Sequence, residues 1–200
     1  MKRIVYAVIL LTWTAGLLLI AQTRETARPI PCDPDNGGIT LPAEFCAAVA
    51  VDGIGIGRQM AVAANGDLFV ATRNSESSQG AIVALRDTNG DGKFDARETF
   101  APEGGTGLAL RPGYVYLGQD TRIVRYPRKE GELKPSGPAE TIATLPDQSG
   151  HRAKGLAFDE AGGMYVNVGA PSNACQSTGE NDRKPGVPGQ MPCPDRKSVV

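Results

Sequence analysis

Apolar and polar residues alternate in three similar stretches of the chain, and each stretch is interrupted by a glycine-containing turn. The three stretches are residues 60–71, 107–118 and 150–169. Alternation with a period of two on both sides of a turn predicts a β-hairpin. The turn glycines, Gly66, Gly113 and Gly162, are 47 and 49 residues apart, so the hairpins recur at a nearly constant interval.

A repeat of this length with about four short strands is typical of a β-propeller blade, because one small sheet buries both faces only when it stacks on its neighbours around an axis. Blade one is expected at residues 57–100, blade two at 101–149, and blade three from residue 150. Further strands are expected at 81–85, 123–126 and 140–143. The alternative is a β-sandwich whose hairpins are similar by chance. We predict an all-β chain with a partial β-propeller over residues 57–194.

The chain is short for a closed propeller. Closure requires about four blades or more, and the repeat accounts for about two and a half. After Pro194 the pattern stops, and residues 195–200 read like the translation of a common sequencing adapter. We therefore expect a non-native tail at 195–200 and a gene that continues beyond codon 194.

The N-terminus has the layout of an export signal. Lys2 and Arg3 precede an apolar run at residues 4–21. No clear cleavage site follows, and eighteen residues is about the minimum for spanning a bilayer, so residues 1–23 are either a signal peptide or a membrane anchor. The expected location is periplasmic or extracellular. The formal net charge of −1 does not indicate a basic surface that would bind nucleic acid. The 25 glycines and 15 prolines are typical of a turn-rich β protein.

Four cysteines in an exported chain predict two disulfides, with three connectivities to choose from. The favoured pairs are Cys32 with Cys46, within the stapled segment at residues 24–56, and Cys175 with Cys193, around the loop that follows the second strand of blade three. Free or metal-binding thiols are the alternative, but no pair has the CxxC spacing of a metal site.

An acidic stretch at residues 87–98 fits the twelve-residue calcium-loop pattern, with Gly92 at the sharp turn. The expected ligands are Asp87, Asn89, Asp91, the carbonyl of Lys93, Asp95 through water, and Glu98 as a bidentate group. No helix is expected on either side, so the loop is not an EF-hand. The alternative is a solvated Asx-rich turn between strands.

Connections in an up-and-down blade alternate between its two ends. The end called here the top face collects the loops before first strands and after second strands. These are residues 72–78, 103–106, 118–121, 148–154 and 170–193. The acidic loop falls on the opposite face.

His151, the only histidine, lies on the top face as a candidate base, although a surface or hydrogen-bonded loop histidine is the common alternative. Lys154 is expected to be a solvated charge.

Three segments resemble the glucose/sorbosone dehydrogenase family, in particular its sorbosone dehydrogenase-like branch. They are residues 32–46, residues 58–70 and residues 150–175, and the resemblance extends over 32–194. The family is similar to soluble quinoprotein glucose dehydrogenase, a six-bladed propeller that binds pyrroloquinoline quinone (PQQ) at the top of the axis and oxidises a sugar at C1.

The resemblance implies that His151 is the general base and that hydride passes to PQQ. The implied partners are a sugar or sugar-aldehyde substrate and an electron acceptor such as a cytochrome c or a quinone. Ala170 stands where the glucose enzymes carry an aspartate that supports the histidine. The family's cofactor-binding Arg and Lys come from blades beyond residue 194, so this polypeptide by itself is expected to be inactive.

Two other functions fit parts of the pattern. A non-catalytic, calcium-stabilised propeller would bind a sugar or a protein without any reaction. A lactone-hydrolase propeller would hold calcium on the axis, but it needs carboxylate and Asn ligands on the top face, whereas the acidic loop is expected on the other.

Overall fold

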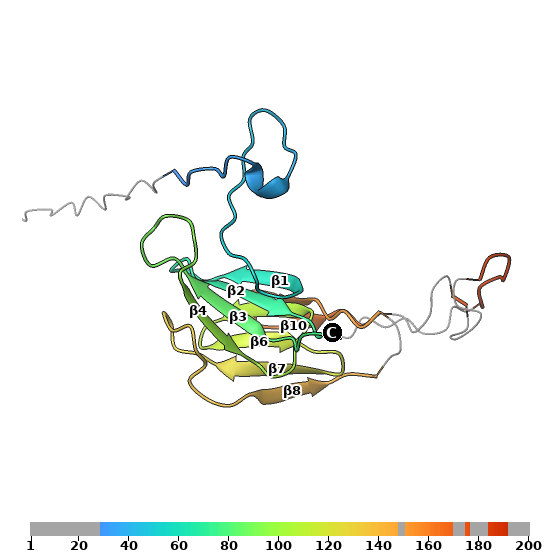
Figure 1. Ribbon diagram of the computed structural model, residues 1–200. Coiled ribbons are helices and arrows are strands. Elements are labelled where there is room, and N and C mark those ends of the chain that lie inside the picture. The colour runs from blue at the N-terminus through green and yellow to red at the C-terminus, as the bar shows by residue number, and fades with distance from the viewer. Residues whose placement is uncertain (1–28, 148–150, 170–174, 177–183, 192–200) are drawn as a thin grey trace, which may run out of the picture.

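The computed structural model describes residues 29–147, 151–169, 175–176 and 184–191 (Figure 1). Blade one is a four-stranded antiparallel sheet in the order β1-β2-β3-β4. Its strands are β1 (Gly57–Val62), β2 (Leu68–Thr72), β3 (Ile82–Arg86) and β4 (Ala96–Phe100). The predicted span of blade one, 57–100, is confirmed.

Blade two repeats the arrangement in the order β5-β6-β7-β8, and a two-stranded hairpin, β9 with β10, follows it. The strands are β5 (Gly107–Arg111), β6 (Tyr114–Gly118), β7 (Arg122–Pro127), β8 (Glu140–Thr144), β9 (Leu156–Phe158) and β10 (Met164–Val166). A short 3-10 helix, η1 (Asn36–Gly38), precedes the blades.

The sheets meet along their first strands, as the blades of a propeller do. β1 contacts β5, and β5 contacts β9. The backbone N–H of Leu108 in β5 donates to Oε1 of Gln59 in β1 at 3.1 Å. The all-β, partial-propeller prediction is therefore confirmed, with two full blades and one hairpin among the described residues.

The core lies mainly between blades one and two. Successive side chains of a strand point to opposite faces of its sheet, so one face of each blade supplies the side chains that pack between the two blades. Its fully or nearly fully buried members are Phe69, Ala71, Ile82, Ala84, Ala101, Leu108, Val115, Leu117, Val124 and Tyr126. A second cluster, formed by Ile123, Leu145, Leu156 and Val166, packs the hairpin on blade two.

The stapled segment covers the other face of blade one. Val51 and Ile54 pack against the buried residues Val70, Val83 and Leu85. The predicted disulfide between Cys32 and Cys46 is present, with a Cα–Cα distance of 5.7 Å. Such bonds persist in oxidising compartments, which supports export.

The second predicted disulfide is described at one end only. Cys175 is disulfide-bonded, and its expected partner, Cys193, lies outside the described residues. The predicted signal or anchor at residues 1–23 and the tail at 195–200 also lie outside them. Within the described ranges, no helix is long and apolar enough to span a membrane.

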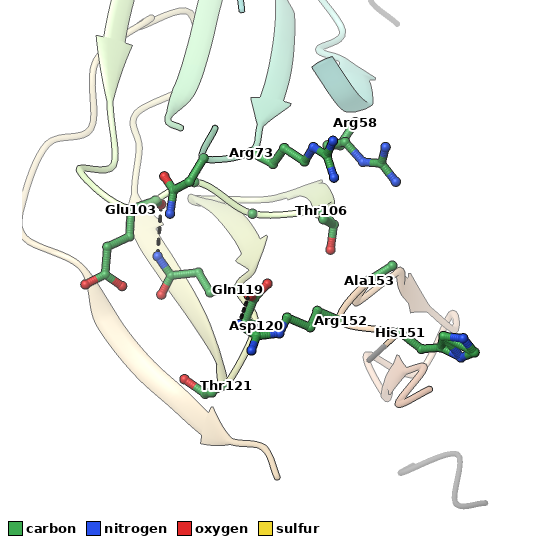
Figure 2. Close-up of a pocket in the computed structure, with 13 residues that line it drawn as sticks. Arg58, Arg73, Glu103, Thr106, Gln119, Asp120, Thr121, His151, Arg152 and Ala153 are labelled. Atoms are coloured by element: carbon green, nitrogen blue, oxygen red, sulfur yellow. Dashed lines mark hydrogen bonds and ion pairs between the residues drawn. The ribbon is translucent and has the colours of Figure 1, made fainter. Parts of the chain in front are cut away.

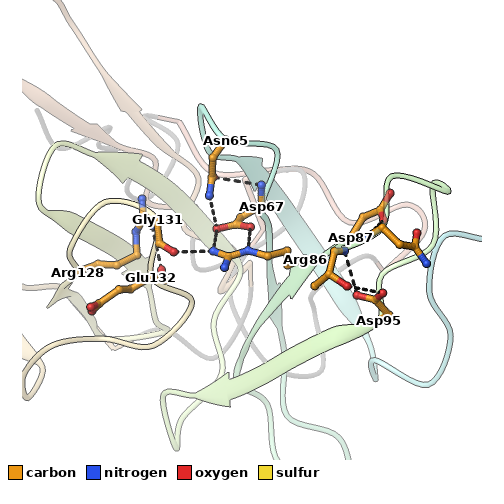
Figure 3. A network of polar contacts seen from close by, with 10 residues as sticks. Asn65, Asp67, Arg86, Asp87, Asp95, Arg128, Gly131 and Glu132 are labelled. Carbon is orange, nitrogen blue, oxygen red and sulfur yellow. Dashed lines mark hydrogen bonds and ion pairs between the residues drawn. The ribbon is translucent and has the colours of Figure 1, made fainter. Parts of the chain in front are cut away.

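An ion pair within blade one also contacts blade two at their bottom ends, through a hydrogen bond from its arginine (Figure 3). The Asp67 carboxylate, 1% exposed, accepts hydrogen bonds at 2.7 Å from Nε and from a terminal nitrogen of Arg86. Asn65 also donates to this carboxylate, at 2.8 Å. The Arg86 guanidinium donates onward to the carbonyl of Gly131 in the β7–β8 loop. The hydrogen bond from Arg86 lowers the pKa of Asp67 below its ordinary value.

Candidate functional site

A cavity of about 480 Å³ lies where the connecting loops of the three blades converge (Figure 2). It is lined by Arg58, Arg73, Asn74, residues 103–106, residues 119–121 and residues 151–153. Four of the five loops that chain parity places on the top face therefore meet here. The fifth, residues 170–193, is largely outside the described residues.

His151 lines this cavity, as expected for the candidate base. It is exposed, and its backbone has a φ of 43°, in the left-handed region that few non-glycine residues adopt. Strained backbone of this kind is held in place by surrounding structure and is frequent at functional sites. Gly169 is one of the residues packed against His151, since a Cβ at Gly169 would lie 2.5 Å from the His151 carbonyl oxygen. Ala170, which replaces the family's supporting aspartate, lies outside the described residues.

Lys154 fixes the loop that carries His151, and the expectation that it is a solvated charge is wrong. Its side chain is 0% exposed, and its Nζ donates to the Arg152 carbonyl at 3.0 Å. Its backbone N–H donates to Oγ1 of Thr106 at 2.8 Å, which joins the loop to blade two. Burial lowers the pKa of Lys154 below the usual lysine value.

Glycines in blade two make room for this loop. A Cβ at Gly107 would lie 1.8 Å from the Lys154 carbonyl oxygen, and one at Gly118 would lie 2.5 Å from it. These distances are far below any contact that a side chain tolerates. The two glycines therefore set how closely the loop approaches blade two.

The cavity is polar, and its two carboxylates already have partners. Asp120 forms an ion pair with Arg152 at 3.2 Å. Glu103 pairs with Arg122, which also donates to Gln119 at 2.6 Å. Hydrogen bonds among these groups hold the β4–β5 and β6–β7 loops together at the rim.

The acidic loop lies at the other end of blade one, as predicted, because it joins β3 to β4. Asp87 accepts backbone N–H groups from the four residues Asn89, Gly90, Asp91 and Gly92, at 2.7–3.3 Å. Asp95 accepts from the backbone and the hydroxyl of Thr88, at 3.0 and 2.6 Å. These hydrogen bonds lower the pKa of both carboxyls, the one from Gly92 contributing most at Asp87.

The loop is shorter than the twelve-residue pattern, since β4 begins at Ala96. Glu98 is therefore a strand residue, paired with Ala84 of β3, and its carboxylate meets Lys134 at 3.1 Å. It does not join the other predicted ligands. Within the described ranges, no three His, Cys, Asp or Glu side chains are placed to hold a metal ion. Calcium binding at Asp87, Asn89, Asp91, Lys93 and Asp95 stays a prediction.

No protein-family model and no curated protein matches this sequence. Two solved structures resemble the fold. The iodide structure of Trichoderma reesei Carbohydrate-Active Enzymes Family AA12 aligns with a TM-score of 0.53 and 18% identity over 63% of this chain and 33% of that one. The calcium structure of the same family aligns with a TM-score of 0.51 and 19% identity, over 60% and 31%. At this identity the likeness shows the fold, and the chain spans about a third of each structure.

Proposed function

We propose that this chain is the N-terminal part of an exported, periplasmic or extracellular quinoprotein dehydrogenase of the glucose/sorbosone dehydrogenase family. It would oxidise an aldose or a sugar aldehyde with PQQ as the hydride acceptor. The observation that carries the proposal is His151, held with a φ of 43° at the wall of a polar cavity where three blades converge. The family resemblance supports the choice of reaction.

The cavity is suited to a polar ligand. Its volume of about 480 Å³ lies in the range of about 300–1,000 Å³ that small-molecule sites occupy. Its lining is rich in arginine and in hydrogen-bonding groups, which fit an acidic quinone and a sugar. When bound, PQQ supplies the two-electron acceptor that protein side chains lack.

The chain's own contribution is proton transfer and orientation. The His151 imidazole would accept the proton of the sugar hydroxyl as hydride leaves the same carbon. Lys154 and Thr106 hold the segment that directly follows it, through hydrogen bonds to each other and to the Arg152 carbonyl. The two similar structures are of carbohydrate-active enzymes, which supports a sugar as the substrate.

Reconstitution tests the proposal. The protein is expressed from the gene read through codon 194 to its natural stop, purified without cofactor, and mixed with PQQ and a panel of aldoses. We expect dye reduction that requires both PQQ and a sugar, with a matched preparation lacking PQQ as the control. A folded protein that binds sugar and reduces no dye under these conditions would favour the non-catalytic propeller.

Calcium is expected to stabilise the protein through the acidic loop. At a hundred times the dissociation constant, a bound ion adds about 2.7 kcal/mol, which corresponds to a rise of roughly 5–10 °C in melting temperature for a domain of this size. Melting with calcium and with a chelator measures the shift. Asp87→Asn should remove it, and Asp52→Asn, outside the loop, should keep it. An identical melting temperature in calcium and chelator would eliminate the site.

A further inference from the structure

Two arginines of the cavity lack a counter-charge. Arg58 and Arg73 line it and are exposed. Neither guanidinium makes a hydrogen bond or an ion pair anywhere in the described part of the chain, whereas both lining carboxylates are paired with other arginines. The unpaired positive charge of the cavity is therefore concentrated on these two side chains.

The backbone brings the two arginines to the same place. Arg58 is the extra residue of an irregularity in β1, since its two neighbours pair with successive residues of β2. A bulge of this kind redirects a side chain and is frequent beside functional sites. Arg73 directly follows β2, and its backbone N–H donates to the Ile56 carbonyl at 3.1 Å. Both side chains thus leave the top ends of adjacent strands and extend toward the cavity (Figure 2).

Two like charges in one place repel each other, and a bound anion would relieve that repulsion. The planar guanidinium offers paired donors that match the two oxygens of a carboxylate. Arg122 neutralises Glu103 and Arg152 neutralises Asp120, so the charges left over in the cavity are those of the two arginines. Two guanidiniums can together bind one carboxylate through several charge-assisted hydrogen bonds.

We infer that Arg58 and Arg73 form a carboxylate-binding subsite for a sugar that carries one carboxylate, such as a uronic or an aldonic acid. This inference specifies the substrate class of the proposed function. It depends on that function only for the oxidation of the bound sugar. Binding itself requires neither the quinone nor His151.

Calorimetric titration of the 200-residue chain without quinone tests the subsite. The probes are D-glucuronate and its neutral counterpart D-glucose. We expect glucuronate to bind at least about tenfold more tightly, and the preference to weaken as salt rises. The double variant Arg58→Gln/Arg73→Gln should bind the two sugars equally. Lys129→Gln removes one positive charge from an exposed residue at the opposite face, so it should retain the preference.

The Lys variants separate charge from geometry. Arg58→Lys/Arg73→Lys keeps both charges and loses the paired donors, so glucuronate binding should fall severalfold and stay above that of the Gln variant. Equal binding of glucuronate and glucose by the wild-type chain, or a preference that survives in the double Gln variant, would overturn the subsite.

A PQQ titration distinguishes the two ligands whose carboxylates the arginines could bind, the quinone and the acidic sugar. Tight PQQ binding that the double Gln variant abolishes, in a chain that does not bind glucuronate, would overturn the acidic-sugar assignment. Failure of the redox proposal leaves these titrations unchanged. Conversely, quinone-dependent oxidation of glucose by a protein with no preference for glucuronate would reject the subsite alone.

Discussion

Replacing His151 with asparagine is expected to lower kcat for quinone-dependent sugar oxidation by about 10²–10⁴-fold, the usual contribution of a positioned general base. Asparagine is the informative substitute because His151 has a φ of 43°, and asparagine tolerates that backbone region better than alanine does. The variant thus removes the base and keeps the loop. KM should change little, since proton transfer acts in the transition state.

The measurement is steady-state dye reduction by the protein expressed from its full gene, with and without the substitution. PQQ binding, followed by the absorbance of the quinone, and the melting temperature should both match the wild-type values. Tyr165→Phe, which removes a hydroxyl bonded to Asp159 in the β9–β10 hairpin, is the control and should retain activity. Wild-type kcat in the asparagine variant would remove His151 from the mechanism.

Asp67→Asn should destabilise the fold by about 2–3 kcal/mol. Breaking a fully buried ion pair costs about 3–5 kcal/mol, and the expected loss is smaller here because the Arg86 side chain is 35% exposed to solvent. The Asp67 carboxylate is 1% exposed, so the variant leaves the inner end of Arg86 without its anion. The loss also weakens the bottom contact between blades, since Arg86 reaches the loop of blade two.

Urea unfolding at neutral pH measures this loss, with Asp120→Asn as the matched control. Asp120 and Arg152 form an ion pair whose side chains are 46% and 52% exposed, so breaking it should cost less than about 1 kcal/mol. Equal effects of the two substitutions would contradict the assignment of Asp67 as a buried anchor.

Acid adds a second readout for Asp67. Its pKa is lower in the folded protein than in the unfolded chain, where an aspartate titrates near about 3.9. The folded state therefore gains stability above that pH and loses it as the pH falls through the lower, folded value. Below about pH 4 the difference in unfolding free energy between wild type and Asp67→Asn should shrink.

The blades were predictable because each combines period-two alternation with a turn glycine, and both signals are local. Strand β4 was obscured because it overlaps the calcium-loop pattern and carries Arg97 and Glu98 on a partly exposed strand. The pattern assigns Glu98 to the loop, but the pairing of Ala84 with Glu98 continues the sheet instead. Backbone hydrogen bonds thus ended the loop three residues early.

The site was predictable only in outline. Chain parity identified the face and placed His151 on it. The burial of Lys154 could not be predicted, because the space for it comes from glycines more than thirty residues away in blade two. Arg58 and Arg73 look like ordinary solvated charges in the sequence. The available signal was that one lies at the start of a first strand and the other follows a second strand, at the same predicted face.

The close fit of the Lys154 carbonyl against Gly107 and Gly118 also limits which residues can be substituted during evolution. A methyl group at either glycine would displace the segment that carries His151, so both positions should tolerate substitution poorly although neither bears a reactive group. A library of random variants selected for loss of sugar oxidation should therefore yield changes at these two glycines alongside those at the histidine. The position of the segment that carries the candidate base therefore depends on two glycines of the neighbouring blade.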